Sequence, residues 1–182
     1  WYLEGEWTPT RRARIVSGFR VDYARDSGHA DFSPRINARY DLVPSIASDE
    51  DEAIGQKRLR TTIKGGVGLF HQAPQFQETE PVFGTPNLKS NRAIHYSIGA
   101  EQELSRRIEL SLEGFYKDLT QLVSRSADTS GAFAYDNQGQ GSVIGLEALL
   151  KYKPDANFFG WIAYTLSRSV RQNRPDDEEY LY

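Results

Sequence analysis

Strict alternation of apolar and charged or polar residues is the feature that most constrains the fold of this chain. It is clearest from Ile108 to Glu113, where isoleucine and leucine alternate with glutamate and serine. Successive side chains of a β-strand point to opposite faces, so this segment has one apolar face and one polar face. The same period recurs along the chain and fits a helix poorly. The pattern therefore predicts an all-β protein.

Eight segments carry this alternation, and we predict a strand for each. Their approximate bounds are 2–8, 12–25, 33–43, 60–72, 93–105, 106–124, 142–153 and 157–171. Ten residues of a strand at ~3.3 Å each, tilted by ~45°, span roughly 23 Å, which matches the apolar band of a membrane barrel. The longest apolar run, 158–164, is far shorter than the roughly 20 residues that a membrane helix needs.

Composition fits a membrane barrel better than a soluble or disordered chain. Hydrophobic residues make up only 38% and charged residues 26%, yet the chain has 10 Tyr, 9 Phe and 3 Trp. Disordered chains are poor in aromatic residues, whereas a barrel strand needs only every second residue to face lipid. The absence of cysteine excludes disulfides and thiolate metal sites. A net charge of −3 gives no basis for binding nucleic acid.

The predicted connections alternate between short turns and long polar loops, as in outer-membrane barrels. We expect the periplasmic side to carry the turns near 9, 43–59, 105 and 155. We expect the outer side to carry 26–32, 72–92, 125–141 and the tail from 172. The segment 45–57 is unusually acidic for a turn, and we interpret it as a solvated insertion.

Aromatic residues lie near the ends of the predicted strands. Those at the turn side are Trp7, Tyr40, Tyr152 and Phe158. Those toward the loop side are Tyr23 and Tyr116. Such rings are typical of the girdles at the two lipid–water boundaries, because the ring is apolar while its hydroxyl or indole N–H prefers water.

Several stretches, taken in order, are similar to those of a known family. They are YLEGEWTP at 2–9, GFRVD at 18–22, SPRINARY at 33–40, TTIKGGVGLFHQAP at 61–74, PNLK at 86–89, GLEAL at 145–149 and GWIAYTLSRS at 160–169. Together they resemble the C-terminal half of the β-barrel of TonB-dependent outer-membrane receptors. The resemblance covers nearly the whole chain in the family's order.

The resemblance implies a transmembrane antiparallel β-barrel of about 22 strands with a plug domain inside, of which this chain holds about eight strands and no plug domain. It implies an outer-membrane location in a Gram-negative bacterium. Such a receptor binds a scarce ligand at its extracellular loops and imports it with energy delivered by TonB. The implied partners are outer-membrane lipid, the receptor's own plug domain, the TonB complex and a small ligand. Siderophore, cobalamin, sugar and peptide all remain open as that ligand.

We expect the chain to be a piece of a longer protein. It contains no methionine and opens directly on a strand pattern. Residues 176–182 do not have the pattern of a closing strand.

No catalytic constellation, cofactor site or metal site is predicted, so we expect no enzyme. The histidines, His29, His71 and His95, are scattered without a second ligand at metal spacing. The glycine-rich segment 65–68 lacks the Lys-Ser/Thr ending of a phosphate-binding loop and lies inside a strand pattern. Glycines there are better explained by close approach of neighbouring groups.

Two sets of residues are candidates for a functional role. The loop aromatic residues that we expect to contact ligand are Phe76, Phe83, Phe133 and Tyr135. The charged residues that we expect to face the lumen include Arg20, Arg39, Lys64, Glu113 and Glu147. The lumen set either contacts the plug or ligand, or forms a solvated wall in which opposite charges pair across strands.

Two alternatives remain open from the residues. One is a complete, closed barrel of eight strands that acts as a structural or adhesive outer-membrane protein, since eight is an allowed number. The other is a soluble β-rich domain that binds or hydrolyses carbohydrate, which for hydrolysis would need a cleft with paired carboxylates.

Overall fold

A single antiparallel sheet accounts for almost all of the structure, a computed structural model that describes residues 1–44, 59–82, 84–127, 134–154 and 157–182. The sheet has nine strands, and each pairs with the next strand in the sequence. The strands are β1 (Tyr2–Thr10), β2 (Ala13–Ala24), β3 (His29–Val43), β4 (Thr61–Gln72), β5 (Asn91–Glu103), β6 (Ile108–Arg125), β7 (Tyr135–Tyr152), β8 (Gly160–Gln172) and β9 (Tyr180–Leu181).

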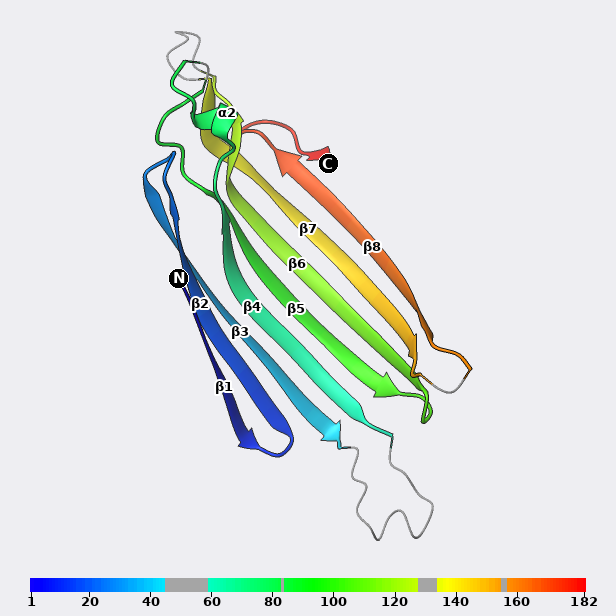
Figure 1. Cartoon of the computed structure of the whole chain (residues 1–182). Coiled ribbons are helices and arrows are strands. Elements are labelled where there is room, and N and C mark those ends of the chain that lie inside the picture. The colour runs from blue at the N-terminus through cyan, green and yellow to red at the C-terminus, as the bar shows by residue number, and fades with distance from the viewer. Residues whose placement is uncertain (45–58, 83, 128–133, 155–156) are drawn as a thin grey trace, which may run out of the picture.

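The strands run side by side at a common tilt, and the connections gather at two opposite ends of the sheet (Figure 1). We call the end that carries the connections after β2, β4, β6 and β8 the loop end, and the opposite end the turn end. A short helix, α2 (Phe76–Thr79), lies in the connection between β4 and β5 at the loop end. No helix in the described part of the chain has the length and apolar character required to cross a bilayer.

The register sorts the side chains into an apolar face and a polar face, as the alternation predicts. Directly paired residues share a face. One apolar row is Tyr40, Ile63, Ala100, Leu112, Ala148 and Tyr164. The polar row one residue away is Arg39, Lys64, Gly99, Glu113, Glu147 and Thr165.

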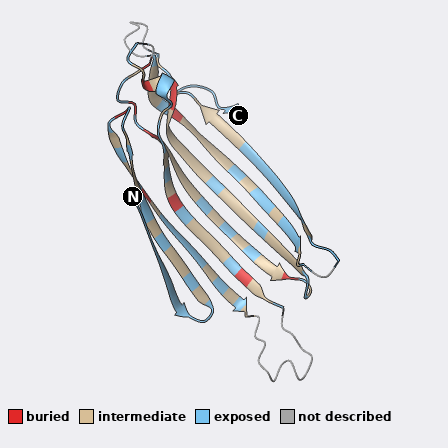
Figure 2. Cartoon of the chain, in the orientation of Figure 1, coloured by how far each residue is buried: buried red, intermediate tan, exposed pale blue. Residues whose placement is uncertain are grey.

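The apolar face is left uncovered within this chain. Ile98 is 75% exposed and Ile162 is 69% exposed, although both are aliphatic. Leu88 and Val123 are the only buried apolar side chains among the described residues. Figure 2 shows the same result, with exposed and half-buried residues along every long strand. An apolar sheet face of this extent requires an apolar environment, since water would make it strongly prone to association.

The apolar face has the height of a membrane band. On β6 its outward residues run from Ile108 through Tyr116, and the next outward residue is Asp118. Nine residues of a tilted strand cover roughly 20 Å, close to the ~25 Å apolar band of such barrels. Tyr96 and Tyr116 stack toward the loop end, with ring centroids 6.4 Å apart. Tyr152 packs edge to face on Phe158 at the turn end, at 5.3 Å.

All eight predicted strands are present, but the first predicted turn is misplaced. We predicted a turn at Thr8-Pro9-Thr10, whereas β1 continues to Thr10 and the turn lies at residues 11–12. Proline lacks an N–H for the sheet, and here it falls where the register shifts between Trp7 and Thr10. The Thr10 hydroxyl then accepts a hydrogen bond from the N–H of Ala13, at 3.1 Å, and secures the turn.

Two other loops are shorter than predicted because strands extend into them. We expected β7 to begin near 142, but pairing continues past a bulge to Arg125 and Tyr135. Gln121, at this bulge, has a φ of 55°. We also assigned 26–32 to a loop, yet β3 begins at His29. The extension of β7, 135–141, is mostly polar, whereas the extension of β3 contains Phe32, whose ring lies 5.4 Å from that of Phe19.

The end of the chain contains a ninth strand that the sequence did not predict. The two-residue strand β9 pairs with β8, through Val170 with Leu181 and Arg171 with Tyr180. The sheet remains open in this chain, with β1 and β9 at its edges. The acidic insertion at 45–57 lies outside the described residues.

Candidate functional site

The five charged residues predicted to face the lumen share the polar face. Arg39 is paired directly with Lys64, and Glu113 directly with Glu147. Arg20 lies on the same face at the level of Ser33 and forms an ion pair with Asp22, at 2.5 Å, along its own strand. Like charges opposite each other are unfavourable. The oppositely charged partners of Arg39, Lys64 and Glu113 must therefore be residues other than those directly opposite them.

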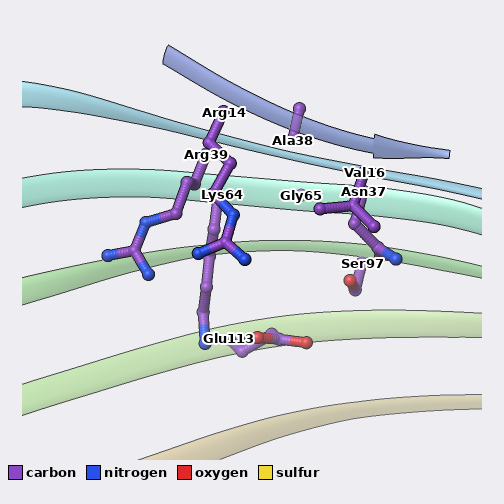
Figure 3. Close-up of a pocket in the computed structure, with 9 residues that line it drawn as sticks. All are labelled: Arg14, Val16, Asn37, Ala38, Arg39, Lys64, Gly65, Ser97 and Glu113. Carbon is purple, nitrogen blue, oxygen red and sulfur yellow. Dashed lines mark ion pairs between the residues drawn. The ribbon is translucent and has the colours of Figure 1, made fainter. Parts of the chain in front are cut away.

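A network at the centre of the polar face supplies these partners. Glu101 on β5 accepts from Arg39 at 3.2 Å and lies 3.4 Å from the Lys64 ammonium. Lys64 also reaches Glu113, at 2.8 Å. Lys64 and Glu113 lie two strands apart, so this pair spans the strand between them (Figure 3). Arg39 and Glu101 also lie two strands apart. We call Arg39, Lys64, Glu101 and Glu113 the central network.

The strand between Lys64 and Glu113 leaves room for this reach because it carries a glycine at that level. Gly99 lies between Lys64 and Glu113 in the polar row. A Cβ added at Gly99 would meet the backbone oxygen of Leu112 at 2.6 Å. The central network borders a cavity of about 260 Å³, whose wall also contains Arg14 and Asn37.

A second set of ion pairs ties the turn end together. Lys153 lies 2.6 Å from Glu103 and 3.5 Å from Glu109. Arg60 forms an ion pair with Glu109 at 3.2 Å, and its backbone N–H donates to Glu103 at 3.1 Å. Glu103 is buried, at 7% exposure. Its hydrogen bond from Lys153 raises the pKa of that ammonium above its ordinary value. We call these four residues the turn-end cluster.

Toward the loop end the polar face changes character. The rings of Phe70, His95 and Phe115 follow one another, at 6.3 Å and 5.9 Å between centroids. The Lys117 ammonium lies over the Phe115 ring at 5.3 Å. Among the described residues, neither Lys117 nor Arg171 forms an ion pair with a carboxylate. Cation–π contact takes the place of ion pairing here.

The segment 84–90, which we call the loop strap, is fixed across the loop end. The Asn137 side chain donates to the carbonyl of Lys89 and accepts from its N–H, both at 2.8 Å. The Asn137 side chain therefore makes the two hydrogen bonds with the Lys89 backbone that a neighbouring strand would otherwise make. The Thr85 hydroxyl contacts the backbone of Tyr135, and Ser90 donates to Asp31 at 2.5 Å. The strap thereby links β3 to β7.

The comparisons with known proteins agree with this geometry. The family described as TonB dependent receptor-like, beta-barrel matches residues 1–181. The chain belongs to this family. The segment is therefore part of an outer-membrane β-barrel of a Gram-negative bacterium, in a family of receptors and transporters rather than enzymes.

A curated relative of this TonB-dependent receptor segment is an iron-regulated outer membrane virulence protein of Vibrio cholerae serotype O1. It is 26% identical over 136 residues, and the match covers 69% of this chain and 18% of the relative. This chain thus spans less than a fifth of that relative's length.

Solved structures share the fold. The siderophore receptor PirA from Pseudomonas aeruginosa gives a TM-score of 0.66 at 19% identity, over 93% of this chain and 32% of that one. The RagAB peptide importer gives a TM-score of 0.67 at 12% identity, over 93% of this chain and 22% of that one.

The four loop aromatic residues of the receptor segment are placed only in part. Phe76 lies on α2 and is 70% exposed. Tyr135 is the first residue of β7, and its backbone is bound to Thr85. Phe83 and Phe133 lie outside the described residues. A ligand role for these four residues stays a prediction.

Two of the three histidines lie within hydrogen-bonding distance of oxygen atoms. His29 Nε2 lies 3.1 Å from the carbonyl oxygen of Asn87, and His71 Nδ1 lies 3.0 Å from the Ser33 hydroxyl. Within the described ranges, no group of three metal-ligating residues gathers. The glycine-rich segment 65–68 lies inside β4, as its strand interpretation predicted, and the Phe70 ring covers Gly68 at 2.8 Å from a Cβ built there.

Sequence reasoning missed two features of this surface. It placed Glu101 among the lumen-facing charges without identifying its partners, and it did not single out Glu103 or Arg171. Both depend on which strands lie two places apart, which a period of two does not encode.

Proposed function

We propose that this chain forms part of the barrel wall and outer loops of a TonB-dependent importer. In this role the complete receptor binds a scarce ligand at its extracellular loops and passes it through a plugged barrel with energy from TonB. The proposal rests on one observation. In this member of the family, the long strands carry apolar side chains on one face of the sheet and charged side chains on the other.

The polar face is proposed to line the lumen. Its ion pairs join strands that are two places apart, and such a reach is favoured on the concave side of a curved wall, where side chains converge. Arg20, Arg39, Lys64, Glu113 and Glu147 would then face the plug. Because most of the charge at the turn end is neutralised within the wall, the plug would contact a surface with little net charge there.

The loop end is proposed to receive the ligand. It carries the strap, which is held by side-chain hydrogen bonds from both β3 and β7. It also carries cations without carboxylate partners among the described residues, together with the aromatic side chains. Rigid, aromatic and partly charged surfaces are typical of binding sites. The plug domain and the TonB contact belong to parts of the receptor other than this wall.

Family membership disfavours both alternatives raised by the sequence. A soluble carbohydrate-binding domain would cover its apolar sheet face, which this sheet leaves exposed. A closed eight-stranded barrel would pair its first and last strands, whereas β1 and β9 are sheet edges here.

Uptake by three strains tests the proposal: wild type, a deletion of the full-length gene, and the deletion complemented by the gene. The radiolabelled probes are a ferric siderophore, cyanocobalamin, a maltooligosaccharide and a short peptide. We expect the deletion to abolish uptake of one class, the gene to restore it, and a protonophore to stop it. Equal uptake of every class in wild type and deletion would show that the import role is wrong.

A further inference from the structure

The apolar face carries a groove at the turn end, across the ends of β6, β7 and β8 (Figure 1). Its volume is about 230 Å³. This is below the ~300–1,000 Å³ of typical small-molecule sites, so the groove suits a single hydrocarbon chain better than a compact ligand. The apolar side chains of its wall belong to Ile108, Leu150, Tyr152, Phe158 and Ile162.

The register places this groove on the side of the sheet opposite the two ion-pair sets. Ile108, Tyr152 and Gly160 form one row of directly paired residues. Leu150 and Ile162 are paired in the next row toward the loop end. Both rows belong to the apolar face, since Ile108 is the first outward residue of β6 and directly paired residues share a face. Because this face meets lipid, the groove is filled from the bilayer and not from the lumen.

A glycine and an aromatic pair shape the groove. Gly160 lies directly opposite Tyr152 and leaves the row open at this position. A Cβ built at Gly160 would lie 3.3 Å from the Phe158 ring, closer than the optimal separation of two carbon atoms. The Phe158 ring meets the Tyr152 ring edge to face, with centroids 5.3 Å apart. The glycine therefore lets the Phe158 ring lie close to the strand and form one wall of the groove.

An arginine lies at the polar end of this groove. Arg107, in the turn between β5 and β6, donates from Nη1 to the Tyr152 hydroxyl at 3.2 Å. The carbonyl of Arg107 accepts from the N–H of Lys153 at 2.7 Å, which fixes the turn against the end of β7. Arg107 and its neighbour Arg106 are both exposed. A cation is thus held beside the hydroxyl of a ring whose apolar part lines the groove.

An apolar groove with a cation at its polar end fits an amphiphile that has an anionic head. The phosphate of a phospholipid lies at the boundary between water and hydrocarbon, and its acyl chains enter the apolar band. A guanidinium carries five N–H donors in a planar fork, so it can hold a phosphate in addition to the tyrosine hydroxyl. A lipid without phosphate would gain only the apolar contacts, and a free phosphate would gain only the arginine.

We propose that this groove binds one phospholipid of the leaflet at the turn end, with its phosphate on Arg107 and one acyl chain beside Phe158 and Leu150. The proposal concerns the outer side of the wall, so it does not depend on which ligand the receptor imports. It assigns to β6, β7 and β8 a specific lipid partner, which is distinct from the general solvation of the apolar face by the bilayer.

Native mass spectrometry of the full-length receptor, titrated with lipid in detergent, tests this site. The probe is dioleoylphosphatidylglycerol, and dioleoylglycerol, which has the same chains and no phosphate, measures general solvation. We expect one saturable adduct with the phospholipid and only weak, unsaturated adducts with the diacylglycerol. Arg107→Gln should weaken phospholipid binding about tenfold or more, because it removes a charge-assisted pair with the phosphate.

The matched control for the charge is Arg11→Gln. Arg11 is exposed in the turn between β1 and β2, at the same end of the sheet, and it does not line the groove. This variant removes the same charge, and phospholipid binding should not change. Equal weakening by Arg107→Gln and Arg11→Gln would mean that only the net charge of the turn end matters, and would overturn the proposal.

A second variant keeps the test decisive if Arg107→Gln does not reach the membrane. Gly160→Val fills the groove, leaves Arg107 in place and should also weaken phospholipid binding about tenfold, because the acyl chain loses its apolar contacts. Its control is Gly5→Val, on the apolar face of β1, where a Cβ would meet no described atom within 4 Å. Unchanged binding in Gly160→Val, or equal weakening in Gly5→Val, would refute the groove as the site.

The same titration separates the other possible occupants of the groove. Diacylglycerol adducts as tight as those of the phospholipid would mean general solvation by lipid. Displacement of the phospholipid by inorganic phosphate at constant ionic strength would assign Arg107 to free phosphate. A lipid-free dimer that Gly160→Val dissociates would assign the groove to a second copy of the receptor. Each of these three results overturns the proposal.

Discussion

The turn end and the loop end of the polar face are built from the same kinds of residue, but they treat charge differently. At the turn end and centre, Lys153, Arg60, Arg39 and Lys64 all have carboxylate partners within 3.5 Å. At the loop end of β6 and β8, Lys117 and Arg171 contact the Phe115 and Tyr182 rings instead, whereas Arg20 and Arg35 on β2 and β3 form ion pairs with Asp22 and Glu4. The cations of the first region are neutralised within the wall, whereas Lys117 and Arg171 have aromatic rings as partners.

The difference teaches how one wall serves two purposes. Ion pairs that join strands two places apart hold the sheet in its curvature, so removal of one partner should cost stability. Unpaired cations do not contribute to the fold in this way, so their removal should cost binding and leave stability nearly unchanged. Each prediction below tests this separation, from the largest expected effect to the smallest.

The comparison requires both regions to lie on one wall, opposite the lipid. Leu112→Arg places a cation on the apolar face near the middle of the band and should destabilise the receptor by about 2–4 kcal/mol. Ser111→Arg, one residue away on the polar face, should be far milder. Guanidinium unfolding of the full-length receptor in liposomes measures both. Equal losses would contradict the assignment of the two faces.

Glu103→Ala should give the next largest loss, about 1–3 kcal/mol, because it removes a buried acceptor and leaves Lys153 without its shortest pair. Glu147→Ala is the matched control. Glu147 is exposed on the same face and is paired with another glutamate, Glu113, so its removal should cost nothing. The same unfolding assay compares them, and a larger loss for Glu147→Ala would refute the neutralisation of the turn end.

Asn137→Ala should free the loop strap at a cost of about 1–2 kcal/mol, because two backbone groups of Lys89 lose their partner. Hydrogen exchange of the amides in 84–90 measures the effect, which should be faster exchange there and unchanged exchange in β2. Exchange that stays slow in the strap would show that other contacts fix the loop end. Gln138→Ala, at an exposed neighbour on the same strand, serves as the control.

The smallest expected change in stability compares a lysine of the central network with a lysine toward the loop end. Lys64→Met removes the cation shared by Glu101 and Glu113 and should cost about 0.5–1 kcal/mol, since the pair is partly exposed. Lys117→Met should leave stability unchanged, because no carboxylate of the described chain depends on it. Thermal unfolding of both variants in one detergent gives the difference. A larger loss at Lys117 than at Lys64 would reverse the comparison.

Much of the fold was predictable because its cause is local. A period of two sorts each side chain to a face from its own strand alone, and this placed Arg39, Lys64, Glu113 and Glu147 correctly on one face. The failures were also local in origin. Pro9 suggested a turn, but a register shift in β1 accommodates it. The polar segment 135–141 resembled a loop because this part of β7 lacks the alternation of apolar and polar residues.

The sequence by itself determined the alternation, the family and the existence of a charged wall, because each follows from the order of residues along one strand. Only the tertiary structure decided that Lys64 reaches past Gly99 to Glu113, that Asn137 holds the strap, and that the Arg171 guanidinium lies over the Tyr182 ring. These are contacts between strands far apart in the chain. Register, curvature and bulges set them together, and no local pattern contains that information.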